Sequence, residues 1–121
     1  FQQLYLVKKH IIKRKINTKI VECETIREKN GVACSSRNYR LKLKHKEIAS
    51  KIYFYLKKVK YRFNFFNPSL IKKKIIKLGA EKIEYIEFYN IKNFKKSKKF
   101  NKNSRIFIAY YLNKVRLIDN I

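Results

Sequence analysis

The stretch from Lys46 to Asn90 constrains the fold of this chain more than any other. Apolar residues recur from Lys46 onward at the period of an α-helix, and this stripe is made of Ile48, Ile52, Tyr55, Leu56, Val59 and Phe63. Asn67-Pro68 then interrupts the pattern, because the residue before a proline is disfavoured in the helical region. The sequence therefore predicts one long amphipathic helix that ends before Pro68.

A second helix should begin at Pro68, since proline fits the first helical turn. Its apolar positions are Ile71, Ile75 and Leu78, and Gly79 follows where a left-handed C-cap favours glycine. Residues 83–89 are aromatic and β-branched, which is typical of a strand. The glutamates in and beside this strand, namely Glu81, Glu84 and Glu87, are expected to pair with neighbouring lysines.

Further strands are predicted on both sides of this central stretch. Asn30-Gly31 is a strong turn signal, which suggests a strand over residues 19–26 and a short second strand before Ser35. Residues 105–112 are apolar on both faces, so they should form a buried strand, and Asn113-Lys114 could turn it into residues 115–118. Residues 4–21 fit a helix or a strand equally well.

Together these elements predict an α+β fold, with two helices packed on a small mixed sheet and with basic extensions. At 121 residues the chain is expected to be a single domain. Residues 1–20 would form a basic N-terminal extension. Residues 21–121 would form the α+β core, which carries a basic loop over residues 92–102.

The charge of the chain indicates a polyanionic partner. There are 32 Lys and Arg residues against 8 Asp and Glu residues, so the formal net charge is +24. A compact domain with this self-repulsion would be stabilised by a nucleic-acid backbone, which releases its counterions when it is bound. No apolar run of about 18 residues is present, so no membrane partner is expected.

The excess of lysine over arginine has a second explanation. Lys, Asn, Ile, Phe and Tyr dominate the chain, and all five have AT-rich codons. This bias suggests an organellar genome, which places the protein in a mitochondrion or, alternatively, in a plastid. Mutational drift on a solvated surface would explain lysine over arginine, but it would not explain why acidic residues are rare.

The central stretch resembles the C-terminal domain of ribosomal protein three of the universal small-subunit set. The matching residues are Ile48-Ala49, then the run Leu56-Lys57-Lys58-Val59-Lys60-Tyr61-Arg62, then Leu78-Gly79-Ala80-Glu81-Lys82-Ile83-Glu84. The resemblance implies a structural protein of an organellar small ribosomal subunit, with Lys57, Lys58, Lys60 and Arg62 facing RNA where mRNA enters. Since no Gly-x-x-Gly loop occurs, a separate chain would carry the KH half.

This interpretation gives a set of expected RNA contacts and partners. The partners would be ribosomal RNA and neighbouring ribosomal proteins. The expected RNA-binding residues are Lys13, Arg14, Lys15, Arg37, Arg40, Lys57, Lys58, Lys60, Arg62, Lys95, Lys96, Lys98 and Lys99. Phe94 and Phe100 alternate with lysines in the basic loop and would stack on bases, although a disordered loop tip is the competing interpretation.

Two other function classes compete with this interpretation. A free nucleic-acid-binding architectural protein is the alternative, but no recognition-helix signature supports it. An enzyme is not expected, because acid–base and metal chemistry need clustered carboxylates or histidines, and the chain has one aspartate, Asp119, and two distant histidines. The spacing of Cys23 and Cys34 fits no usual zinc pattern, so no metal and no cofactor are expected.

Overall fold

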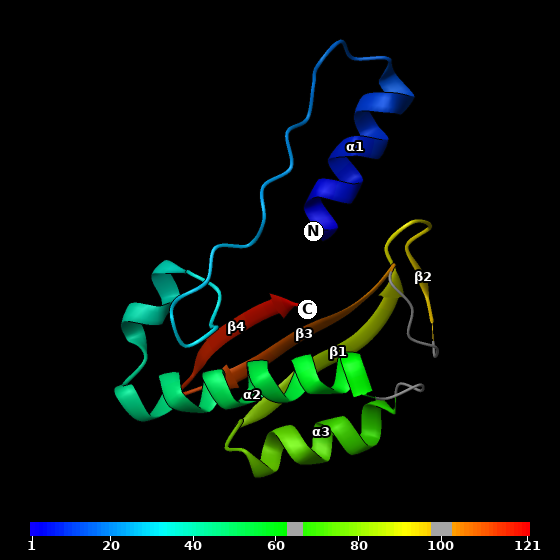
Figure 1. The fold of residues 1–121 in the computed structure, drawn as a ribbon. Helices are drawn as coiled ribbons and strands as arrows, with labels where there is room; N and C mark the ends of the chain where they lie inside the picture. Colours follow the sequence, from blue (N-terminus) through cyan, green and yellow to red (C-terminus); the bar gives the residue numbers. More distant parts are fainter. Residues whose placement is uncertain (63–66, 98–102) are drawn as a thin grey trace.

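The computed structural model describes residues 1–62, 67–97 and 103–121 and shows an α+β fold (Figure 1). Within these residues, three α-helices, one 3₁₀ helix and four strands follow one another. They are α1 (Gln2–Arg14), η1 (Ser36–Arg40), α2 (Leu43–Arg62), α3 (Pro68–Lys77), β1 (Lys82–Asn90), β2 (Lys95–Lys96), β3 (Ser104–Leu112) and β4 (Val115–Asn120).

The four strands form one antiparallel sheet in the order β2-β1-β3-β4. β1 and β3 make the longest pairing, in which Ile86 lies opposite Ile108, and a bulge interrupts the register between Ile83 and Tyr85. Asn113 and Lys114 join β3 to β4 with φ angles of 47° and 61°, as a two-residue hairpin with the right-handed strand twist requires. The predicted hairpin is therefore confirmed.

α2 and α3 lie against the same face of the sheet, and the core fills the space between them (Figure 1). Ile52, Leu56 and Val59 of the predicted α2 stripe are buried there, together with Ile71 and Ile75 of α3. Phe63, the last residue of that stripe, lies outside the described residues. The predicted α+β class is confirmed, and each of the three strand pairings is antiparallel where the sequence suggested a mixed sheet.

The start and end of α3 have the predicted local causes. The backbone N–H of Leu70 donates to Asn67 Oδ1 at 3.2 Å, so Asn67 caps the helix ahead of Pro68. Gly79 follows the helix with a φ of 114°, a backbone conformation that residues with a side chain rarely adopt. A Cβ at this position would also lie 2.9 Å from Ile48 Cδ1, so glycine lets α3 end directly against α2.

The N-terminal region differs from the expectation. Residues 2–14 form a helix, which settles the open choice between helix and strand. The strand predicted over residues 19–26 is wrong, and so is the short second strand. In this region the described structure has only an isolated bridge between Arg27 and Ala33. Val21 and Ile26 remain 75% and 72% exposed, so the apolar residues that suggested a strand have no sheet to pack on.

α1 meets the sheet through aromatic rings. The Phe94 ring stacks on Tyr5 and on Tyr89, with both pairs of ring centroids 4.7 Å apart. Phe94, which was expected to stack on RNA bases, is thus engaged within the protein, and Phe100 lies outside the described residues. Beyond this contact α1 extends away from the sheet (Figure 1), and no residue of the helix is buried. The division of the domain at residue 20 stays a prediction.

The glutamates around β1 have different partners. Glu87 forms an ion pair with Lys96, as expected, whereas Glu84 pairs with Arg116 of β4. Glu81 accepts hydrogen bonds from the backbone N–H groups of Asn113 and Lys114, so it fixes the β3–β4 turn. Among the described residues, no helix is long and apolar enough to cross a membrane.

Replacement of Ile75 tests the helix-on-sheet core. Ile75 is fully buried, so Ile75→Ala should lower the free energy of unfolding by about 2–5 kcal/mol through lost burial and a residual cavity. The next residue, Ile76, is 47% exposed and provides the matched control. Urea unfolding of both variants measures the difference, and equal losses would contradict this packing.

The pair between Glu84 and Arg116 should make stability depend on pH. The hydrogen bond from Arg116 holds the pKa of Glu84 below its ordinary value, so the folded state favours the carboxylate. The stabilisation is present above the pKa of the unfolded state and is lost as pH falls through the lower folded pKa, below about pH 4.5. Glu84→Gln should flatten the acid limb of stability against pH. Glu47→Gln, at an exposed position on α2, should leave that limb unchanged because the Arg116 pair is intact.

Candidate functional site

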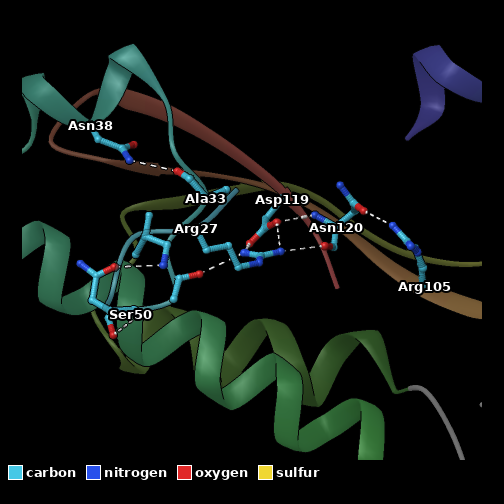
Figure 2. Close-up of polar contacts among 10 residues, drawn as sticks. Arg27, Ala33, Asn38, Ser50, Arg105, Asp119 and Asn120 are labelled. Carbon is cyan, nitrogen blue, oxygen red and sulfur yellow. Dashed lines mark hydrogen bonds and ion pairs between the residues drawn. The ribbon is translucent and has the colours of Figure 1, made fainter. Parts of the chain in front are cut away.

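The segment from Ile26 to Asn38, here called the anchored loop, is held to the last strand by Arg27. The Arg27 guanidinium donates to both carboxylate oxygens of Asp119, at 2.8 and 2.9 Å, and to the Asn120 carbonyl at 3.1 Å (Figure 2). It also donates to the carbonyl of Gly31 at 3.0 Å, within the loop itself. The hydrogen bond to Asp119 raises the pKa of Arg27, although burial opposes this shift.

The turn of the anchored loop packs on α2. Arg27 lies 4.5 Å from the centre of the Tyr53 ring, and the Ser50 hydroxyl donates to the Asn30 carbonyl at 2.7 Å. Gly31 has a φ of 85°, and a Cβ there would lie 2.4 Å from two atoms of the Tyr53 ring. Only glycine therefore fits between the turn and the helix. The turn predicted from Asn30-Gly31 is confirmed.

The far end of the anchored loop is braced by Asn38. Its side chain is 4% exposed, and Nδ2 donates to Glu28 Oε1 at 2.7 Å. The same atom donates to the Ala33 carbonyl at 3.0 Å (Figure 2). Ser35 caps η1, because its hydroxyl accepts the N–H of Arg37 at 3.2 Å. These contacts fix the backbone on both sides of Ser36 and Arg37.

Ser36 and Arg37 are both exposed on this fixed backbone. Arg37 lines a cavity of about 300 Å³ that is bounded by the anchored loop, β4 and the start of α1. Phe1, Gln2 and Asn120 line the same cavity. A guanidinium next to hydroxyl groups on a rigid turn can bind an anionic oxygen group without reorganisation.

The structure spreads the expected RNA-binding residues over several elements. Lys13, Arg14 and Lys15 lie at the end of α1, Arg37 and Arg40 on η1, Lys57, Lys58 and Lys60 on α2, and Lys95 and Lys96 on β2. Lys98, Lys99 and the Arg62 side chain lie outside the described residues. Only Arg37 belongs to the candidate site, while Lys57 and Lys60 line a second cavity. The assignment of these residues to RNA is untested and stays a prediction.

Sequence reasoning missed the residues that build the site. Ser36 had no assigned role, Asn38 was not considered, and Asp119 was noted only as a lone aspartate. The available signal was local: a glycine turn is followed within a few residues by Ser35-Ser36-Arg37-Asn38. Two hydroxyls, a guanidinium and an amide on one short segment suit the binding of an anionic ligand.

A double-mutant cycle tests the anchor. Arg27 and Asp119 are 20% and 12% exposed, so Arg27→Met leaves a mostly buried carboxylate without its partner. The free energy of unfolding should fall by about 2–4 kcal/mol, which lies between the losses typical of exposed and of buried ion pairs. Asp119→Leu should also destabilise the protein, but the double variant should lose less than the sum of the single variants. Strictly additive losses in urea unfolding would show that the two residues are not coupled.

Comparison with known proteins identifies the family. The family model described as pantoate-beta-alanine ligase matches residues 1–121, which is the whole chain. The pantothenate synthetase of Flavobacterium psychrophilum is 39% identical over 127 residues, which cover 100% of this chain and 45% of the relative. The pantothenate synthetase of Francisella tularensis subsp. mediasiatica is 40% identical over 120 residues, which cover 99% of this chain and 39% of the relative.

Solved structures support the same conclusion. Pantoate-beta-alanine ligase from Francisella tularensis, complexed with Beta-gamma ATP and Beta-alanine, is 40% identical and superposes with a TM-score of 0.71, over 99% of this chain and 39% of that protein. The Thermus thermophilus enzyme is 21% identical with a TM-score of 0.81, over 99% and 45%, and shows the shared fold. This chain thus spans less than half the length of these relatives.

These findings correct the functional interpretation of the sequence. The resemblance to the ribosomal protein is wrong, and so are the ribosomal RNA, ribosomal-protein and KH-chain partners that followed from it. The free nucleic-acid-binding alternative is also overturned, and the expectation of a non-enzyme is contradicted by relatives that are ligases. The mitochondrial or plastid location stays a prediction. With a full-length match to the family model and 39–40% identity to its relatives, this chain belongs to the pantoate-β-alanine ligase family.

Proposed function

We propose that this chain is part of an ATP-dependent ligase that joins pantoate to β-alanine. The match over residues 1–121 carries the proposal, and the complex of the Francisella relative with Beta-gamma ATP and Beta-alanine supports it. The chain spans 39–45% of the relatives, so the complete activity requires segments that correspond to the rest of their length.

The chemistry of the reaction needs positive charge at fixed positions. A carboxylate does not condense with an amine at neutral pH, so ATP must activate it. The charge on the phosphates of ATP changes while the carboxylate is activated. Hydrogen-bond donors held in place stabilise this charge without reorganisation. A guanidinium suits this task because its planar donors match two phosphate oxygens at once.

Arg37 and Ser36 are the groups of this chain that we assign to the phosphates of ATP. Both are exposed on η1, and Arg37 lines the cavity beside β4. In the described part of the chain no carboxylate pairs with Arg37, whereas Arg116 in the same cavity is paired with Glu84. Arg37 is thus the arginine of this cavity that is available to a ligand.

The anchored loop explains how these groups stay in position. Arg27 ties one side of the loop to Asp119, and Asn38 ties the other side to Glu28 and Ala33. A loop that is ordered before the ligand arrives loses little conformational entropy on binding. The anchoring residues act through Arg37 and Ser36, and they are positioning residues.

Replacement of Arg37 tests the proposal. In the ligase that contains this chain, Arg37→Ala should lower kcat/KM for ATP by about 10²–10³-fold, as the loss of one strong donor to a developing charge does. Arg37→Lys should recover only part of the loss, since lysine keeps the charge without the paired donors. Ser36→Ala should have a smaller effect in the same direction.

Arg40→Ala is the matched control, because Arg40 is an exposed arginine on the same helix that does not line the cavity. Pantothenate formation and ATP binding by calorimetry are the measurements. Equal effects of Arg37→Ala and Arg40→Ala would contradict the assignment of Arg37 to the phosphates of ATP. A wild-type protein that forms no pantothenate from pantoate, β-alanine and ATP would contradict the proposed function itself.

A further inference from the structure

A second cavity adjoins the site above and shares Phe1, Thr25 and Asn120 with it. Its volume is about 620 Å³, within the range of small-molecule sites. α2 contributes Lys57 and Lys60, β3 contributes Arg105, and the extended segment before the anchored loop contributes Glu22 and Glu24. The function proposed above assigns no role to this cavity.

The charges that line the cavity are unbalanced. Arg27 also lines it but is neutralised by Asp119, and Glu22 is paired with Lys8. Arg105 donates to Asn120 Oδ1 at 2.7 Å, but that acceptor is neutral and leaves the charge of the guanidinium in place (Figure 2). Among the described residues no carboxylate forms an ion pair with Lys57, Lys60 or Arg105. Among the side chains that line the cavity, three cations therefore face one uncommitted carboxylate, Glu24.

Lys60 lies in an environment that disfavours its positive charge. The residue is half-buried, and burial, followed by the charge of Arg105, lowers the pKa of its ammonium group. Lys60 and Arg105 come from α2 and β3, so the fold itself brings the two like charges together. An anion between them would offset both effects.

We propose that this cavity binds a small phosphate-bearing anion at a site separate from Ser36 and Arg37. Three positive charges against one negative charge suit a dianion, and an ammonium and a guanidinium are both common phosphate ligands. The volume of about 620 Å³ matches the size of a small molecule. Asn120 links the two sites, since its side chain accepts from Arg105 and its carbonyl accepts from Arg27.

Calorimetric titration with inorganic phosphate at constant ionic strength tests the site. Wild-type protein should show saturable binding of one phosphate, and Lys60→Gln should weaken it at least tenfold. Lys57→Gln, at an exposed position, provides a second variant with little risk to folding. Lys58→Gln is the control, because this exposed lysine of α2 does not line the cavity, and it should change the affinity less than twofold.

Two results would overturn the proposal in this experiment. One is the absence of saturable phosphate binding to the wild-type protein. The other is an equal loss in the Lys58 and Lys60 variants, which would indicate diffuse attraction by the basic surface. A third measurement follows the ¹³Cε resonance of Lys60 by NMR: phosphate should raise the pKa of this lysine, and an unchanged titration would also count against the site.

Titration with ATP separates this site from the one proposed for the ligase reaction. The Lys60→Gln variant should lose the binding of inorganic phosphate and keep the binding of ATP. The Arg37→Ala variant should lose the binding of ATP and keep that of inorganic phosphate. If Arg37→Ala abolishes both, the two cavities do not bind independently and the second site is rejected. If Arg37→Ala keeps both, the phosphate site stands and the assignment of Arg37 fails.

Discussion

The ion pair between Arg27 and Asp119 joins parts of the chain that are 92 residues apart. Through it the closing strand β4 holds the anchored loop, and the loop in turn presents Ser36 and Arg37. A mostly buried pair of this kind adds little net stability, because its desolvation offsets much of the attraction. Its main effect here is geometric. Arg27 satisfies the carboxylate, two carbonyls and the face of Tyr53, so alternative positions of the loop would leave buried polar groups without partners.

The net charge of +24 indicated the wrong class of partner. Many of the lysines that produce it lie on exposed helix surfaces, such as Lys72, Lys73, Lys74 and Lys77 of α3. Such residues keep a helix soluble whatever the protein does. Net charge bears on solubility and on non-specific association, and it does not define a reaction. The informative cations are the few unpaired ones that the fold places in cavities among the described residues, namely Arg37, Lys57, Lys60 and Arg105.

The ribosomal resemblance rested on residues whose causes are local. Leu78-Gly79-Ala80 is a helix terminus: the N–H of Gly79 donates to the Ile76 carbonyl and that of Ala80 to the Ile75 carbonyl. Gly79 also lets α3 end against Ile48 of α2. Any fold in which a helix ends in this way before a strand will produce a similar sequence. These residues therefore predicted the junction between helix and strand correctly, but the family inferred from them was wrong.

The sequence by itself determined the elements whose causes lie within a few residues. The apolar period predicted α2 and α3. The limits of α3 are set by Asn67, Pro68 and Gly79. The β3–β4 hairpin followed from its apolar strand and its turn. Tertiary structure alone decided the site and the cavities. Arg27 meets Asp119, Phe94 stacks on Tyr5, and Lys60 faces Arg105 only because the sheet and helices bring them together. Side-chain partners so far apart leave no periodic signal in the sequence, because local backbone preferences do not depend on them.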